Sequence, residues 1–526
     1  MTPQALHTPH TPTGTGAVAP EPAVGPAVGP AVGPAVGPAV GPAVGPAVEP
    51  APEPVAAPAA APAVEPGTSG VRPMNRPDSG RFRPRRLAGV SRPRTAEAVA
   101  ELVRTAAASG TPLHPVSTGR NWGLGSANPV RDGATVLDLS RLDRIREIDI
   151  RRGYAVVEPG TTQGELSSRL AGTDRMLNLT GASLHTSIIG NILERGIGLH
   201  RPRAEDLAGL ELVLADGERV RTGWWPSPDG AAVIQPHGHG PSLNHLFTQA
   251  AWAVVTAAVV RLLPRPQSVR ILPATFPADR LTEGIDTLRA WTAGHLVPPT
   301  TKIYNPVAAR TYGLARADGR PGDAYLAHLA LTGETDVTSA LARCLFARLE
   351  EPQCPLAQAP STAADAQVHA AYAGNGDPDD TLFRRKTGDC CARCLDRAGG
   401  LLMFLPVVPF EGAAVETAAA LVDAAREEGT ARPGITMNVL DADTVDHVVT
   451  LRFDPGDLVS TTAAHRTLDR LHTSFTAHGW PPYRPDIDHP RTTAGDSGLH
   501  RRLAATLDPS GVFAPGRFGP SPHLPH

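Results

Sequence analysis

The sequence has 526 residues, with 49 basic and 52 acidic side chains and a formal net charge of −3. This near-balance disfavours a nucleic-acid partner, which a strongly basic chain would favour. The length predicts at least two domains, and no apolar run reaches the roughly 20 residues that span a bilayer.

Residues 1–80 are predicted to be a disordered low-complexity tail. The tetrapeptide A-V-G-P recurs from Ala23 to Pro46, and proline at every fourth position prevents a helix and removes backbone donors. The tail holds too little bulky apolar surface to offset the entropy of ordering it. The first ten residues lack the basic start and apolar core of a secretory signal, so a cytoplasmic protein is expected.

Regular structure is expected from about residue 82. Thr95 is a good N-cap and Gly110 a good stop for a helix over 92–110. A short strand at 115–116 and a strand over 135–139 enclose a glycine-rich segment, 117–129, which reads S-T-G-R-N-W-G-L-G-S-A-N-P.

The glycine-rich segment 117–129 predicts a cradle for a diphosphate. Gly119, Gly123 and Gly125 allow positive φ and close approach to the main chain. Exposed N–H groups and small hydroxyls form an anion site, and Arg120 adds a positive charge. A surface loop is the alternative. The segment lies between strands rather than at a strand-to-helix turn, which disfavours a nicotinamide-binding Rossmann site.

The rest of the chain predicts an α+β arrangement. A helix is expected over 162–170, and a second glycine region follows at 181–198 with an apolar wall of isoleucines and leucine. A hairpin with an Asp216-Gly217 turn is expected over 210–223, then a short helix and a long strand over 246–264. A second domain begins near 268 with a strand at 269–276 and a helix at 279–293. A flexible connection is expected near 351–380, and a closing loop over 507–520.

The cysteines do not predict a disulfide framework, because their number is odd and three of them cluster. A zinc site needs four ligands, usually in two paired sets, and a second set is missing nearby, so no metal is expected. Ordinary thiols and a Cys391/Cys394 redox pair remain alternatives. The five cysteines are Cys344, Cys354, Cys390, Cys391 and Cys394.

Several motifs occur in the order found in one flavoprotein family. They are the first glycine segment, V-V-E-P-G-T-T, S-I-I-G-N-I-L-E-R-G-I-G, L-E-L-V-L-A-D-G-E-R-V-R-T-G, L-F-T-Q-A-A-W-A-V-V-T and D-P-S-G-V-F-A-P-G. On these motifs the chain resembles the FAD-binding flavoproteins of the vanillyl-alcohol oxidase and p-cresol methylhydroxylase type. The resemblance implies an FAD-binding domain of two α+β subdomains (81–267), an α+β cap or substrate domain (268–455) and a C-terminal return to the FAD domain (456–520).

The resemblance also implies which residues bind FAD. His447 matches a cap histidine that some members link covalently to the flavin, whereas a histidine is missing from 117–129, where bicovalent members carry one. The other implied FAD-binding residues are Ser117, Thr118, Gly119, Arg120, Asn121, Gly123, Gly125, Ser126, Pro159, Gly190, Asn191, Gly196, Gly198, Val255 and Arg517.

Tyr483 and Arg484 match the family's pair that holds a phenolate oxygen, a role suited to a short hydroxyl donor beside a fixed charge. Phenol-oxidising members have a tyrosine where this chain has Leu124 and a carboxylate where it has Ala182. These departures disfavour a para-substituted phenol and leave another alcohol, such as a natural product, open.

The leading hypothesis is an FAD-dependent oxidoreductase that takes a hydride from a C–H beside oxygen to flavin N5. His185 or His200 is the expected base, because imidazole titrates near neutral pH. The expected partners are a small-molecule substrate, oxygen or an electron carrier, and a second copy in a homodimer, with neither nucleic acid nor membrane. The rivals are a dehydrogenase that serves a cytochrome or quinone, and a catalytically degenerate flavin-binding protein.

Overall fold

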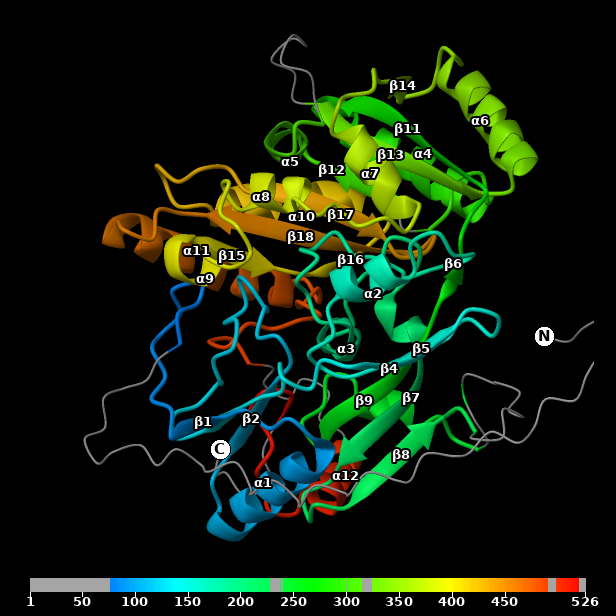
Figure 1. The fold of residues 1–526 in the computed structure, drawn as a ribbon. Coiled ribbons are helices and arrows are strands. Elements are labelled where there is room, and N and C mark those ends of the chain that lie inside the picture. Colours follow the sequence, from blue (N-terminus) through cyan, green and yellow to red (C-terminus); the bar gives the residue numbers. More distant parts are fainter. Residues whose placement is uncertain are drawn as a thin grey trace, which may run out of the picture. The chain divides into compact units, whose positions relative to one another are not determined.

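Four β-sheets, built from separate stretches of the chain, carry the architecture among the described residues (Figure 1). The computed structural model describes residues 76–227, 237, 240–299, 301–314, 324–490 and 498–519. Most of the predicted tail, residues 1–75, lies outside them. The mixture of helices and antiparallel and parallel strands confirms the predicted α+β class.

A three-stranded parallel sheet and one helix flank the first glycine loop. The strand order is β1 (Gly89–Ser91), β3 (Thr135–Asp138), β2 (Leu113–Val116). Helix α1 (Ala96–Ser109) begins where the Thr95 side chain accepts a hydrogen bond from Ala98 N, and it ends at Gly110, whose φ is 66°. Both predicted helix ends are therefore confirmed.

A five-stranded antiparallel sheet packs beside α1. It contains the predicted hairpin, whose strands pair from Gly209↔Gly223 to Val213↔Arg219 around Gly217, with a φ of 81°. The expected short helix before the long strand is the 3-10 turn η2 (Asn244–Phe247). The strand order is β4 (Ile145–Asp149), β5 (Tyr154–Val157), β9 (Val254–Arg261), β7 (Leu207–Val213) and β8 (Arg219–Gly223).

Short elements complete this part of the chain. Helix α2 (Gln163–Arg169) confirms the helix predicted over 162–170, and Thr162 and Glu165 form a capping box at its start. The second glycine region contains helix α3 (Ile188–Leu193), which was not predicted as a helix. Its short length hides the helical period, but Ser187 caps it. The remaining elements are β6 (Arg175–Met176), paired with β10 (Leu263–Pro264), and η1 (Arg203–Asp206).

An eight-stranded antiparallel sheet forms the cap part of the chain. The strand at 269–276 and the helix at 279–293 are confirmed by β11 and by η3 (Ala278–Arg280) with α4 (Leu281–Ala293). The order is β14 (Ala357–Gln358), β11 (Ser268–Pro277), β13 (Ala324–Gly333), β12 (Lys302–Tyr304), β17 (Gly434–Val439), β18 (Thr444–Arg452) and β15 (Leu401–Phe404), with β16 (Val407–Pro409) also on β18.

Side-chain alternation divides the eight-stranded sheet into two faces. On β13, Tyr325, Ala327 and Leu329 enter the core beneath the helices, whereas Leu326 and Ala330 join the cluster shared with the FAD-binding part. The covering helices are α4, α6 (Thr335–Leu349), α10 (Gly412–Ala425) and α11 (Leu458–Ala477). The other face meets α5 (Pro306–Thr311), α7 (Asp365–Tyr372) and residues of the FAD-binding part.

Two segments differ from the sequence expectation. The stretch 351–380, expected to be a flexible connection, contains β14 and α7, and buried Val368 and Tyr372 anchor α7 in the core. Helix α11 lies in the segment expected to return to the FAD-binding part, and it shares the core of the cap sheet. The domain limits remain predictions.

The chain ends as predicted, with helix α12 (Gly498–Leu507) and a closing loop. Phe513 makes a parallel bridge to Leu113, and Val512 and Phe513 are buried in the core of α1. This closing loop therefore packs against α1 and β2.

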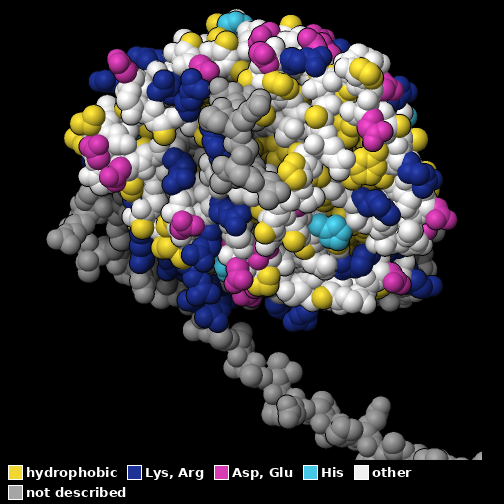
Figure 2. Space-filling view, turned by 90° about the horizontal axis from the view of Figure 1, so that it is seen from above, with side chains coloured by type: hydrophobic (Ala, Val, Ile, Leu, Met, Phe, Trp, Pro, Cys, Tyr) yellow, Lys and Arg dark blue, Asp and Glu magenta, His cyan; other side chains and the backbone are white. Residues whose placement is uncertain are grey.

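The cap face seen in Figure 2 carries basic and acidic side chains interspersed with hydrophobic ones. Among the described helices, each is too short or too polar to cross a bilayer. Small helices lie at the edge of the cap beside the first glycine loop, namely α8 (Thr381–Lys386) and α9 (Leu395–Ala398).

A buried ion network stabilises the five-stranded sheet. Arg146 bridges Glu158 and Glu211 at 2.9 and 3.0 Å, and the two carboxylates are 1% and 3% exposed. Burial raises the pKa of both carboxyl groups, but hydrogen bonds and charges from arginines outweigh burial and leave both pKa values lowered. Removing Arg146 would leave two buried charges with less compensation.

We expect Arg146→Met to lower the free energy of unfolding by about 2 kcal/mol, below the cost of breaking an isolated buried pair, because Arg144 and Arg221 still contact the carboxylates. Urea unfolding measures the change. Arg86→Met, which removes an exposed pair with Asp132, is the matched control and should leave the free energy of unfolding nearly unchanged, because water screens exposed ion pairs. Equal effects of the two changes would contradict the network.

Candidate functional site

A cavity of about 440 Å³ is lined by the two glycine regions, the cap sheet and the C-terminal loop. The glycine regions touch there. A Cβ on Gly190 of α3 would lie 2.4 Å from Ser117 Oγ, so a larger residue at this point would displace the Ser117 side chain. Ser187 holds α3 in place by accepting from Gly190 N at 3.0 Å and donating to Pro159 O at 2.7 Å.

Most of the predicted cofactor residues line this cavity, and three glycines do not. Those that line it are Ser117, Thr118, Gly119, Arg120, Asn121, Ser126, Pro159, Gly190, Asn191, Gly196, Val255 and Arg517.

The three exceptions, Gly123, Gly125 and Gly198, allow close protein packing instead. A Cβ would lie 2.8 Å from Met403 Cγ at Gly123, 2.5 Å from Ile487 at Gly125 and 2.3 Å from Asn178 Oδ1 at Gly198. Their missing side chains make room for neighbouring protein atoms, and their approach to the cofactor stays a prediction.

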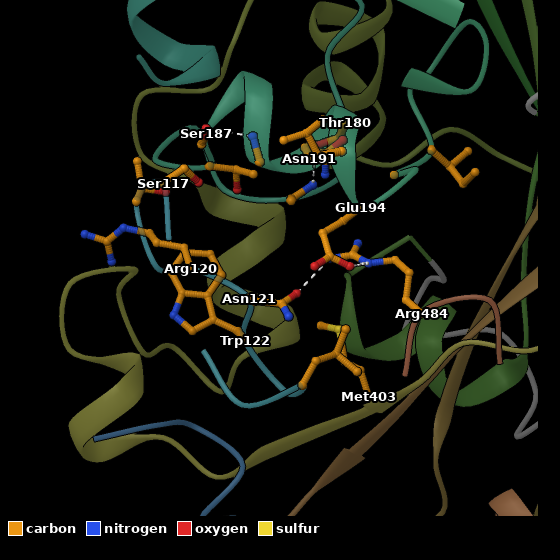
Figure 3. Close-up of a pocket in the computed structure, with 18 of the residues that line it drawn as sticks. Ser117, Arg120, Asn121, Trp122, Thr180, Ser187, Asn191, Glu194, Met403 and Arg484 are labelled. Carbon is orange, nitrogen blue, oxygen red and sulfur yellow. Dashed lines mark hydrogen bonds and ion pairs between the residues drawn. The ribbon is translucent and has the colours of Figure 1, made fainter. Parts of the chain in front are cut away.

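Arg120 lines the cavity, but its guanidinium is used elsewhere. It points away from Asn121 and Arg484 in Figure 3 and donates to the Ala392 carbonyl. Ala392 lies in the cysteine cluster, where the Sγ atoms of Cys391 and Cys394 are 2.6 Å apart and all thiols are free. Arg120 therefore ties the first glycine loop to this cluster rather than pointing at an anion.

Tyr483 and Arg484 both line the cavity, and Arg484 is held from two sides (Figure 3). Its Nη2 donates to Asn121 Oδ1 at 2.7 Å, and its Nε lies 3.7 Å from Glu194 Oε2. The other oxygen of Glu194 pairs with Arg517 at 3.3 Å. Burial raises the pKa of Tyr483, so this phenol stays protonated as a donor. The pair is thus tied to both glycine regions.

Asp486 stabilises the loop that carries Tyr483 and Arg484. His472 Nε2 and His489 Nδ1 lie 2.9 and 3.0 Å from Asp486 Oδ2, and backbone amides of 488 and 489 bond its other oxygen. Burial raises the pKa of Asp486, but the histidine hydrogen bonds outweigh it and lower that pKa overall. These three side chains could hold a metal ion by geometry, yet their mutual hydrogen bonds account for the arrangement.

His447, for which the resemblance implies a link to the flavin, does not line the cavity in this structure. Asp446 and Val448 of β18 line the cavity, whereas His447 does not. Alternation along the strand sends His447 to the other face, where its neighbours Val445 and Val449 join the core beneath the helices. His447 is 1% exposed, and burial lowers its pKa to about 4.

The two histidines expected to act as base are also misplaced. Leu184 and Thr186 line the cavity, but His185 between them does not. His200 lies outside the lining too, and its Nε2 is 2.9 Å from the Tyr372 carbonyl. Burial lowers the pKa of His200. Leu124 and Ala182, the two departures from the family pattern, do line the cavity.

The cap sheet contributes polar residues that the sequence analysis missed. Lys302 of β12 pairs in register with Asn438 of β17, which pairs with Asp446 of β18. Lys302 Nζ donates to Asn438 Oδ1, and Asn438 Nδ2 donates to Asp446 Oδ1 at 2.6 Å. Lys386 at the end of α8 faces the same cavity, as do Tyr304 and Tyr312. The sequence did contain a signal for these positions, because Lys302 and Lys386 are its two lysines and lysine is therefore a rare residue type in this chain.

The pKa values of this group reflect burial. Burial lowers the pKa of Lys302 and of Lys386 to about 8, against the opposing effect of Asp446. Burial raises the pKa of Asp446 to about 6, against the hydrogen bond from Asn438 and the lysine charges. At neutral pH the group therefore carries two positive charges and one negative charge.

The cavity fits a large polar cofactor such as FAD. Thr186 Oγ1, Asn191 Oδ1 and Asp446 Oδ2 are buried at its wall with no hydrogen-bond partner among the described residues. Buried polar atoms are normally paired, so these atoms fit a ligand with several donors and acceptors. Gly119, with a φ of 68°, and Ser117 expose backbone and hydroxyl groups to the same space.

Comparison with known proteins identifies the family. Residues 87–223 match the family model of an FAD binding domain. The chain is 30% identical to the 1'-carboxy-chondrochloren decarboxylase of Chondromyces crocatus, over 82% of this chain and 90% of that protein. It is 26% identical to the flavoprotein subunit of 4-cresol dehydrogenase (hydroxylating) from Pseudomonas putida, over 81% and 86%.

The fold agrees with these relatives. The crystal structure of p-cresol methylhydroxylase with substrate bound superposes with a TM-score of 0.70 at 24% identity, covering 84% of this chain and 90% of that chain. The chain belongs to the FAD-binding flavoprotein oxidoreductases of the p-cresol methylhydroxylase type, and its cofactor is FAD.

Proposed function

We propose that this oxidoreductase removes a hydride from a substrate C–H bond next to oxygen, with the oxygen held by Tyr483 and Arg484. FAD, when bound, supplies the two-electron acceptor for this chemistry. The observation that carries the proposal is the fixed guanidinium of Arg484, which Asn121 and Glu194 hold at the wall of the cavity. Such preorganised donors stabilise negative charge that develops on an oxygen.

We assign the proton acceptor to Asp446 in place of the histidines. Its Oδ2 faces the cavity without a hydrogen-bond partner among the described atoms, and its raised pKa of about 6 suits a general base near neutral pH. The hydride leaves the substrate carbon, the hydroxyl proton moves to the carboxylate, and a carbonyl forms.

The residues at the cavity support the half-reaction in which a substrate reduces the flavin, and they are compatible with more than one substrate. The names of the relatives cover dehydrogenation of a cresol and a decarboxylation. Leu124 and Ala182 replace the groups expected at a phenol site, so an alcohol other than a simple cresol fits as well. Electrons would then pass to oxygen or to a carrier protein, which stopped-flow reoxidation with oxygen distinguishes.

Anaerobic mixing tests the function directly. We expect the flavin absorbance of the FAD-loaded protein to bleach with at least one member of a panel of benzylic, allylic and phenolic alcohols. A yellow protein that no member of the panel reduces would instead support the degenerate flavin-binding alternative.

Arg484→Ala should slow flavin reduction by about 100-fold, the typical cost of removing one donor to a developing oxyanion. FAD should stay bound, because Arg517 still pairs with Glu194. Rapid-mixing absorbance measures the rate. Arg280→Ala, which removes an exposed arginine paired with Glu283, is the control and should leave the rate unchanged. Unchanged reduction in Arg484→Ala would remove this residue from the site.

His447→Leu tests the corrected position of this histidine. We expect FAD content and its behaviour on acid precipitation to stay as in the wild type, because His447 faces the helical core. The folded pKa of about 4 lies below the ordinary value of 6.5, so His447 contributes stability above pH 6.5 that is lost as the pH falls toward 4. The variant should therefore lose less stability over this interval in urea unfolding. Release of bound flavin by the substitution would restore the covalent assignment.

A further inference from the structure

The two lysines of the chain lie at one end of the cavity, on elements far apart in sequence. Lys302 is on β12 and Lys386 at the end of α8, and both line the cavity together with Asp446. The other 47 of the 49 Lys and Arg residues are arginines. A basic residue of this chain is thus almost always an arginine, and the two exceptions both line the cavity, together with Arg120, Arg484 and Arg517.

Lysine and arginine are not equivalent in such a place. An ammonium is a compact point charge with three donors, whereas a guanidinium is a wide planar fork. Lys302 is 9% exposed and uses one donor on Asn438. Its Nζ lies 4.0 Å from the point where a Cβ on Gly181 would be, so the ammonium reaches across to the FAD-binding part.

The charged side chains that line the cavity do not balance. Four are acidic, namely Glu194, Asp377, Asp380 and Asp446, and five are basic, namely Arg120, Lys302, Lys386, Arg484 and Arg517. Asp446 is the one carboxylate in the row Lys302–Asn438–Asp446, and it faces two ammonium groups. Lys386 has neither a hydrogen bond nor an ion pair with any residue that the structure describes. A buried charge without a partner is costly, so one negative charge from outside the protein would complete the group.

Two sources of that negative charge are conceivable, and position favours one. The diphosphate of FAD belongs with the first glycine loop and Gly190, which lie on the FAD-binding part. The lysines lie on the cap side, and Asp446 interacts electrostatically with Tyr483 of the oxygen-holding pair. A substrate whose oxygen is bound by Tyr483 and Arg484 would therefore extend toward the lysines.

We propose that Lys302 and Lys386 form an anion subsite that binds a carboxylate of the substrate, so that the natural substrate carries an oxygen function at one end and a carboxylate at the other. This inference rests on the proposed function, since Tyr483 and Arg484 define the other end. Asn438 acts as a positioning residue that holds Lys302 and Asp446 in line.

The test uses two matched probes on the FAD-loaded protein. 4-Hydroxyphenylacetate and 4-hydroxyphenylacetamide differ in charge and little in shape, and benzoate with benzamide repeats the comparison without a phenol. Perturbation of the flavin spectrum gives each Kd. We expect the acids to bind about tenfold or more tightly than the amides, with the preference falling above about pH 8 as the amines lose their protons.

Lys302→Met and Lys386→Met should each weaken acid binding by about tenfold and leave amide binding nearly unchanged. Arg348→Met, an exposed arginine paired with Glu351, is the control and should change neither. Arg484→Ala should instead weaken the acid and amide of the phenolic pair alike, so failure of the proposed function is recognised separately.

Amine acylation provides a second readout that needs no variant. Because Lys302 and Lys386 are the two lysines, acetylation at pH 8 followed by peptide mass spectrometry reports on this subsite alone. We expect the acids to protect both lysines and the amides to protect neither. Equal binding or equal protection by acid and amide overturns the proposal. So does a lysine variant that changes the reoxidation of reduced, ligand-free flavin while the preference for acids persists.

Discussion

The site depends on the strict alternation of side chains in the eight-stranded sheet. One face must be apolar, because it forms the core under α4, α6, α10 and α11. The other face is thereby free to be polar, and it presents Lys302, Asn438 and Asp446 in one row across three paired strands. A strand residue cannot serve both faces, so a shift of one position exchanges a buried core residue for a cavity residue.

This constraint explains where sequence reasoning succeeded and where it failed. The family, the α+β class, the helix capped by Thr95 and the hairpin at Gly217 follow from local signals that need no long-range packing. The motif match selected His447, one position away from the residue that lines the cavity. Matching a motif identifies the strand but not the direction in which each side chain points. Its neighbour Asp446 faces the cavity and carries a usable charge there.

The glycines and histidines show a second limit. Gly119 and Gly123 look alike in sequence, yet one faces the cavity and the other makes room for Met403. His185 was singled out for its chemistry, although the bend of its loop turns it away from the cavity. Both outcomes depend on partners far along the chain. Composition carried information that motif matching ignored, since the scarcity of lysine marks two positions in the cavity.

The carboxylate of Glu194 is shared by Arg484 and Arg517, which reach it from two separate points near the end of the chain. Phe513 closes the FAD-binding part by pairing with Leu113, four hundred residues earlier. During synthesis the glycine loops therefore emerge well before Arg484 and Arg517, which complete the wall of their cavity. FAD can be enclosed only after both of these later segments have been made.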